Sequence, residues 1–170
     1  FLPNNFDPTG INSDSPLLGG KTYHSRLLEL SYSSDPSKRL FITTSHNFGK
    51  FYNGRKYPFD NNFFLRFEPN LIASLKFNYD IISLSHLNKN SKLWLIGPKF
   101  DFSFSKKLFL ATLVQFNSQS ENLGVNARLQ WRFSGLSNLF LVYNDNYLVR
   151  ENEPLSHRVR SLNLKISYWF

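Results

Sequence analysis

The stretch GVNARLQWRF, residues 124–133, decides the fold because polar and apolar residues alternate along it. A period of two is typical of a β-strand whose two faces meet different environments. Shifting such a strand by one residue would exchange the two faces, so its pairing register is strongly specified. The polar positions are Asn126, Arg128, Gln130 and Arg132, and the apolar positions are Val125, Ala127, Leu129, Trp131 and Phe133.

The same alternation returns along the chain. It is clear in LIASLKFNYDI (71–81), in PKFDFSF (98–104) and in the closing SLNLKISYWF (161–170). Together with GVNARLQWRF and the weaker segments, these stretches predict about nine antiparallel strands. The weaker segments are Arg26–Ser33, Leu40–Phe48, Asn61–Phe67, Leu108–Asn117 and Leu139–Tyr147.

Composition excludes a helical membrane protein. The chain of 170 residues has 18 Phe, 8 Tyr and 3 Trp, yet its mean hydropathy is -0.34. A membrane-spanning helix needs about 20 consecutive apolar residues, and no such run is present. The absence of Cys excludes disulfides and thiolate metal sites. Bulky apolar residues in a hydrophilic chain therefore favour segments that are apolar on one side only.

The links between the predicted strands alternate in length. Short turns are expected at 33–38, 68–70, 105–107 and 134–138, and longer polar links at 49–61, 86–92, 118–124 and 145–159. A tilted strand of about 9 to 11 residues crosses a bilayer, and alternating links are typical of outer-membrane barrels. The sequence therefore predicts an all-β fold, an antiparallel up-and-down transmembrane β-barrel. The short links and the C-terminus share one end, which we expect to be periplasmic.

The C-terminal strand carries a further signal. An alternating strand that ends in Phe resembles the terminal signal that bacterial outer-membrane barrels present to their insertion machinery. The matching positions are Leu164, Ile166, Tyr168 and Phe170. The resemblance implies that this stripe faces lipid, that Phe170 lies in the periplasmic aromatic girdle, and that the insertion machinery is a partner.

The alternation assigns each strand residue to a lumen or to lipid. Six of the predicted lumen residues are basic and two are acidic, so a water-filled pore would favour anions. The alternative is a narrow or plugged barrel whose interior is filled by hydrogen bonds and ion pairs. The predicted lumen set is Arg66, Lys76, Asn78, Asp80, Lys99, Asp101, Gln115, Asn126, Arg128, Gln130, Arg132, Asn144, Asn163 and Lys165. The clearest lipid-facing residues are Phe100, Phe102, Phe104, Leu129, Trp131 and Phe133.

The odd strand count points to missing strands. A sheet in hydrocarbon must close, because every backbone N–H and C=O needs a partner, and single-chain bacterial barrels have even strand numbers. Residues 1–21 are rich in Asn, Asp, Pro, Gly and Ser and are expected to form an extracellular loop or linker. Either this stretch hides a further strand, or residues 22–170 are the C-terminal part of a larger barrel, which is the alternative we expect.

Several phrases together resemble one outer-membrane family. They are SYSSDPSKRLFITTSHNFGKFYNGRKY, LVQFNSQSENLGVNARLQWRFSGLSNLFLVYNDN and the closing SLNLKISYWF, with good agreement at Gln115, Asn117, Trp131, Arg132, Phe133, Tyr143 and Asn144. They are similar to the C-terminal barrel of an uncharacterised Bacteroidota family whose members carry an N-terminal module like the family 9 carbohydrate-binding module. The resemblance implies an anchor or subunit of a surface assembly linked to glycan or nutrient handling. Its partners would be other outer-membrane subunits or the N-terminal part of the same protein.

Other partners and chemistries find less support. The formal charge of +8 is spread singly along the segments, whereas nucleic-acid binding needs a continuous basic patch. Basic residues near the outer rim suit lipopolysaccharide phosphates instead. No catalytic, metal or cofactor residues are expected, because the histidines stand in no recognisable spacing with a nucleophile and a carboxylate. A membrane-embedded hydrolase, with His86 or His157 as the residue to test, stays open as an alternative. The histidines are His24, His46, His86 and His157, and the rim residues are Arg26, Arg55, Lys56, Arg150 and Arg158.

Overall fold

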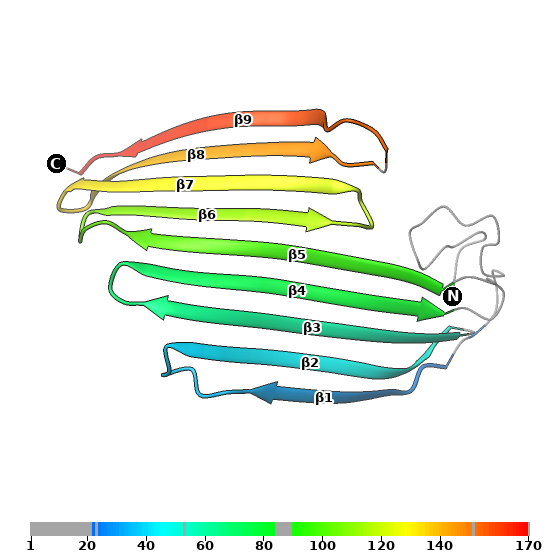
Figure 1. Ribbon diagram of the computed structural model, residues 1–170. Helices are drawn as coiled ribbons and strands as arrows, with labels where there is room; N and C mark the ends of the chain where they lie inside the picture. Colours follow the sequence, from blue (N-terminus) through cyan, green and yellow to red (C-terminus); the bar gives the residue numbers. More distant parts are fainter. Residues whose placement is uncertain (1–21, 23, 53, 84–89, 151, 170) are drawn as a thin grey trace.

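Nine antiparallel strands form one sheet in the computed structural model, which describes residues 22, 24–52, 54–83, 90–150 and 152–169 (Figure 1). Each strand is hydrogen-bonded to the next one in the chain, so the order in the sheet is the order in the sequence. The strands are β1 (Leu27–Ser33), β2 (Leu40–Phe51), β3 (Gly54–Phe67), β4 (Leu71–Ser83), β5 (Asn90–Ser103), β6 (Leu108–Asn117), β7 (Asn122–Ser134), β8 (Ser137–Leu148) and β9 (Ser156–Ser167).

The all-β, up-and-down prediction is confirmed. The described part of the chain contains no helix, and hence none long and apolar enough to cross a membrane. Within the described residues the sheet is not closed, because β1 and β9 make no contact with each other. Each of these edge strands therefore has one side of its backbone without a strand partner among the described residues. The predicted loop or linker at 1–21 lies outside the described residues.

The predicted alternation of short and long links is wrong at the β2–β3 link, and also at the β6–β7 link, where only residues 118–121 separate the strands. The stretch 49–61 was expected to be a long polar connection, but β2 and β3 run through it, and Phe51 pairs with Gly54 across a tight turn. Tyr52 has a φ of 51°, in the left-handed region that favours tight hairpin turns because their backbone then matches the right-handed twist of the two strands. Polar residues in this stretch alternate with Phe and Tyr, so they continue both strands.

The turn between β1 and β2 lies at the end of the sheet where β9 ends (Figure 1). Ser37 donates its backbone N–H to Oδ1 of Asp35 at 2.9 Å. The side-chain hydroxyl and this N–H of Ser37 both hold the pKa of Asp35 below its usual value. The turn is therefore fixed locally by an exposed, charged side chain.

A single layer leaves little room for a core. Phe41 and Ile82 are the buried apolar side chains of the described residues, whereas many large apolar side chains are exposed. The Phe41 ring stacks on Phe64 with 4.2 Å between ring centroids, and the Arg66 guanidinium lies 4.8 Å from the Phe41 ring centroid. Cross-strand hydrogen bonds and pairs of this kind hold the sheet together. The exposed apolar side chains need a partner or a solvent other than water.

Candidate functional site

The residues predicted to face a lumen all lie on one face of the sheet, here called the polar face. Residues directly opposite on neighbouring strands share a face, as do residues two apart on one strand. The register pairs Ser74 with Lys99, Gln115 with Gly124, and Asn126 with Asn144. The set comprises Arg66 on β3, Lys76, Asn78 and Asp80 on β4, Lys99 and Asp101 on β5, Gln115 on β6, Asn126, Arg128, Gln130 and Arg132 on β7, Asn144 on β8, and Asn163 and Lys165 on β9.

Charges on the polar face are only partly paired. Lys56 and Asp80 lie 2.7 Å apart, and so do Lys99 and Asp101. The ion pairs of the described residues include none of four further cations on this face. These cations are Lys76, Arg128, Arg132 and Lys165, and all four are exposed. The polar face therefore carries an excess of unpaired positive charge.

Amide side chains form a hydrogen-bonded ladder across β7, β8 and β9 on the polar face. Asn126 donates to Asn144, and Asn144 donates to the Ser161 hydroxyl at 3.3 Å. Nearer the β6–β7 turn, Asn122 donates to Asn146 at 3.3 Å. Each link joins residues on neighbouring strands, so the ladder fixes the register while leaving part of every amide free to bond elsewhere.

Two hollows open on the polar face at the end opposite to the end of β9. One has a volume of about 290 Å³ and is lined by Lys56, Asp60, Asn78 and Asp80 among others. The second has a volume of about 240 Å³. Asn117 lines both hollows, so they adjoin. The lining of the second is Leu113, Gln115, Asn117, Ser120, Asn122, Gly124, Val125, Asn126, Asn144 and Asn146.

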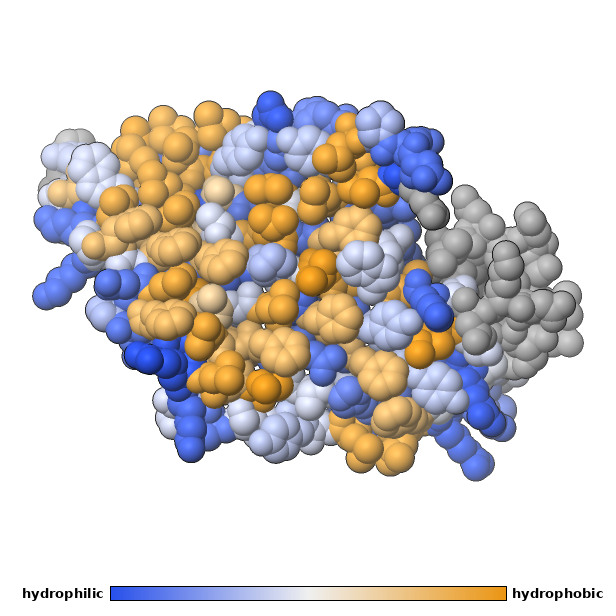
Figure 2. Space-filling view, in the orientation of Figure 1, coloured by the Kyte–Doolittle hydropathy of each residue, from blue (hydrophilic) through white to orange (hydrophobic). Residues whose placement is uncertain are grey.

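The opposite face is apolar. Figure 2 shows one face of the molecule, on which apolar and aromatic side chains gather over the middle of the strands and hydrophilic ones lie toward the ends. The register places Phe102, Leu110, Leu129, Leu141 and Leu164 in one line of direct partners from β5 to β9. A continuous apolar line thus crosses five strands on what is called here the apolar face.

The residues predicted to face lipid all lie on the apolar face. Trp131 is 48% exposed and Phe100 is 40% exposed. Ring centroids lie 6.3 Å apart for Phe100 and Phe102, 5.9 Å for Phe102 and Phe104, and 5.7 Å for Trp131 and Phe133. Leu129 completes the set from the middle of β7. These rings lie at every second position of their strands and are partly exposed. No other part of the described chain covers them.

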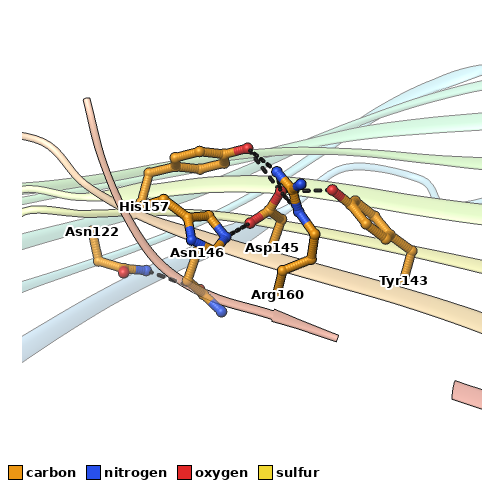
Figure 3. A network of polar contacts seen from close by, with 7 residues as sticks. Asn122, Tyr143, Asp145, Asn146, His157 and Arg160 are labelled. Atoms are coloured by element: carbon orange, nitrogen blue, oxygen red, sulfur yellow. Dashed lines mark hydrogen bonds and ion pairs between the residues drawn. The ribbon is translucent and has the colours of Figure 1, made fainter. Parts of the chain in front are cut away.

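A buried carboxylate interrupts the apolar face near the β8–β9 link (Figure 3). Asp145 is 1% exposed and lies directly opposite Arg160. Its Oδ2 accepts from the Tyr143 hydroxyl at 2.6 Å, the Tyr147 hydroxyl at 2.7 Å and Arg160 Nε at 2.9 Å, and its Oδ1 lies 2.9 Å from His157 Nε2. The sequence prediction missed this network because the predicted strand Leu139–Tyr147 overlapped the link expected at 145–159, so Asp145 was assigned to neither face. The Tyr-x-Asp-x-Tyr alternation of 143–147 was the signal that could have revealed it.

A second polar group lies on the apolar face, on β2 and β3. The Thr44 hydroxyl donates to Oδ1 of Asn61 at 2.7 Å and lies 2.6 Å from His46 Nε2. The His46 ring meets Phe59 edge-on at 5.0 Å between centroids. The three polar groups satisfy one another, which lowers the cost of placing them among apolar side chains.

The C-terminal signal is placed in part. Leu164 and Ile166 lie on the apolar face of β9, but the strand ends at Ser167 and does not continue to the last residues as predicted. Tyr168 keeps to the apolar face, where its ring stacks on Phe133 at 6.4 Å between centroids. The backbone N–H of Trp169 donates to the buried Ser137 hydroxyl at 3.1 Å, so the chain is fastened to β8 after the strand ends. Phe170 lies outside the described residues.

The three histidines of the described residues lie in different parts of the structure. His46 lies on β2, His157 on β9, and His24 before β1, while His86 lies outside the described residues. Within the described ranges there is no group of three or more side chains of His, Cys, Asp or Glu that suits a metal ion. The only carboxylate beside a histidine there is Asp145, which also contacts Arg160.

Comparisons with protein-family models, with curated proteins and with solved structures find no match to this chain.

Proposed function

We propose that this chain is the C-terminal segment of an integral outer-membrane β-barrel that serves as an anchor or subunit of a surface assembly. The observation that carries the proposal is the two-faced sheet, in which an uncovered apolar face and a hydrogen-bonded polar face belong to the same nine strands. A soluble sheet would cover its apolar face with a second layer. In a bilayer, lipid covers that face and the polar face lines the interior.

The open edges of the sheet support a larger assembly. Each unpaired backbone N–H or C=O group along the free sides of β1 and β9 would destabilise the protein in hydrocarbon by roughly several kcal/mol, as any unsatisfied polar group does there. Closure therefore requires strands other than the nine described here, and an even total requires an odd number of them. These strands would come from another part of the same protein or from a partner subunit.

The Asp145 network suits the membrane boundary in this arrangement. With the end of β9 on the periplasmic side, the β8–β9 link lies outside, and Arg160 and His157 lie near that rim, 55% and 46% exposed at their side chains. Tyrosines such as Tyr143 and Tyr147 are enriched at this depth. Lipopolysaccharide phosphates would then be the nearest charged groups of the bilayer.

Single-cysteine labelling tests the proposal directly, because these 170 residues contain no Cys. Neighbouring substitutions Arg128→Cys and Leu129→Cys, in the intact protein in outer membranes, form a matched pair from the two faces of β7. A membrane-impermeant, water-soluble maleimide should label position 128, and a lipid-phase nitroxide should be sensed at position 129. Equal labelling of both positions, or extraction of the protein into buffer without detergent, would refute a lipid-facing apolar face.

An anion-favouring pore is a second candidate function. The exposed, unpaired Lys76, Arg128, Arg132 and Lys165 favour it, because fixed cations along a water-filled lumen raise the local concentration of anions. The paired Lys56–Asp80 and Lys99–Asp101 contribute little net charge.

A further inference from the structure

The hollow of about 240 Å³ on β6, β7 and β8 has a lining without any charged residue. Its polar groups are the amides of one Gln and five Asn side chains together with the Ser120 hydroxyl. The unpaired cations Arg128 and Arg132 lie farther along β7, toward the end where β9 ends, and line no part of it. Along β7 the polar face is therefore divided into a neutral amide part and a basic part.

The floor of this hollow depends on glycine. A Cβ atom at Gly124 would lie 3.2 Å from Asn146 Oδ1, and one at Gly97 would lie 3.6 Å from the Gln115 side chain. Any larger residue at either position would fill space that the amides now border. The absence of a side chain at Gly124 therefore deepens the hollow, and Gly97 leaves room beside the Gln115 side chain that lines it.

The amides keep bonding capacity for a ligand. An Asn side chain offers two N–H donors and an acceptor oxygen with two lone pairs. The ladder uses one donor of Asn126 and one donor of Asn122, and the Asn146 oxygen accepts only the latter. Free amide donors and acceptors therefore lie in the same lining, with no charged side chain among them.

We propose that this amide-lined hollow binds an uncharged, hydroxyl-rich solute of the oligosaccharide class. The inference rests on the proposed function, in which the polar face meets water inside the barrel. A hydroxyl group can both donate and accept a hydrogen bond, so it can bond to the N–H groups and to the oxygens of the amides. A cation would find no carboxylate there, and an anion would bind better at the free cations farther along β7.

The affinity should be weak. No aromatic ring lines the hollow, so a sugar would gain hydrogen bonds without stacking. Hydrogen bonds that replace those to water contribute little each, which places the expected Kd on the order of millimolar. Weak binding also suits a solute that must leave again from a lumen.

The test is saturation-transfer NMR on the intact protein in detergent micelles, with maltotriose as the neutral probe and inorganic phosphate as a competitor. The wild type should give a maltotriose signal that equal phosphate leaves unchanged. Asn126→Leu combined with Asn144→Leu should weaken binding about tenfold through the loss of their hydrogen bonds. Gly124→Val should do the same by filling the hollow, and a β-branched residue suits a strand.

Ser74→Ala is the matched control, because Ser74 lies on the polar face of β4 but lines neither hollow. It should bind maltotriose as the wild type does. The inference fails if folded wild type gives no maltotriose signal, if phosphate displaces the sugar, or if Gly124→Val binds like Ser74→Ala. Labelling at positions 128 and 129 tests the proposed membrane function separately. If the labelling pattern is as expected but maltotriose gives no signal, only the proposal of sugar binding in the hollow is refuted.

Discussion

Arg160 Nε donates to Asp145 Oδ2 at 2.9 Å across the β8–β9 pair, on the face of the sheet that is otherwise apolar. The Arg160 terminal nitrogen also reaches the Tyr147 hydroxyl at 3.2 Å. Two tyrosines, an arginine and a histidine thus share one carboxylate, and Arg160 and His157 come from the edge strand. The network fastens β9 to β8 at the end opposite to the Trp169–Ser137 contact.

Asp145→Ala should destabilise the protein by about 2 kcal/mol, because four partners lose a charged acceptor while the cations left behind remain partly solvated. The free energy of unfolding would be measured by urea titration of the protein folded into lipid vesicles, followed by tryptophan fluorescence. Asp101→Ala is the control, since Asp101 pairs with Lys99 at 2.7 Å with both side chains exposed, and it should cost about 0 to 1 kcal/mol. Equal costs for the two variants would contradict a special role for the Asp145 network.

The second prediction concerns the two faces of β7. Leu129→Lys places a charge in the middle of the apolar line, and it should cost about 2 to 4 kcal/mol if that line faces lipid. Gln130→Lys, one residue later on the polar face, should change stability by less than about 0.5 kcal/mol. The same urea titration measures both. A similar cost at the two positions would mean that the faces do not meet different solvents.

The strands were predictable because each needs only its own alternation. Leu108–Asn117 was predicted with its observed bounds, and Arg26–Ser33 differs from β1 by one residue. The β2–β3 turn was not predictable in this way, since Lys56, Pro58 and Asp60 look like a loop until Phe and Tyr at the intervening positions are read as the other face. Polar residues that alternate with aromatic ones should be read as strand.

Contacts between strands depend on register, which no single segment contains. Asn126 and Asn144 were both assigned correctly to the polar face, yet their hydrogen bond follows only from the β7–β8 pairing. The role of Asp145 was harder to predict, because a carboxylate on the apolar face contradicts the alternation of its own strand. Arg160 explains why a carboxylate is tolerated there, but it becomes a neighbour of Asp145 only when β9 pairs with β8.

Gly49→Ala should open the β1–β2 pair. A Cβ atom at Gly49 would overlap the Arg26 carbonyl oxygen, which accepts from Lys50 N–H at 3.0 Å. The backbone of β1 must move away, at a cost of about 1 to 3 kcal/mol, so amide hydrogen exchange should speed up in residues 27–33. Gly97→Ala is the control, because its added Cβ would meet only side-chain atoms at 3.6 Å and beyond. Unchanged exchange in Gly49→Ala would show that β1 does not approach Gly49 this closely.

Charge reversal at two of the free cations tests the pore. Arg128→Glu combined with Arg132→Glu changes the polar face by four charge units without touching the Lys56–Asp80 or Lys99–Asp101 pairs. If the polar face lines a conducting lumen, the intact protein in a planar bilayer should prefer chloride over potassium, and the double variant should lose or reverse that preference. Reversal potentials in a salt gradient measure it. Asn126→Glu combined with Asn163→Glu would also place acidic charges on the polar face, but it is not a suitable control because it would break the hydrogen bond that Asn126 makes in the amide ladder. The better control is Arg150→Glu, outside the strands, where the preference should not change. A folded barrel that conducts no current would remove the pore function and leave the anchor, because a barrel filled by its own side chains needs no open path.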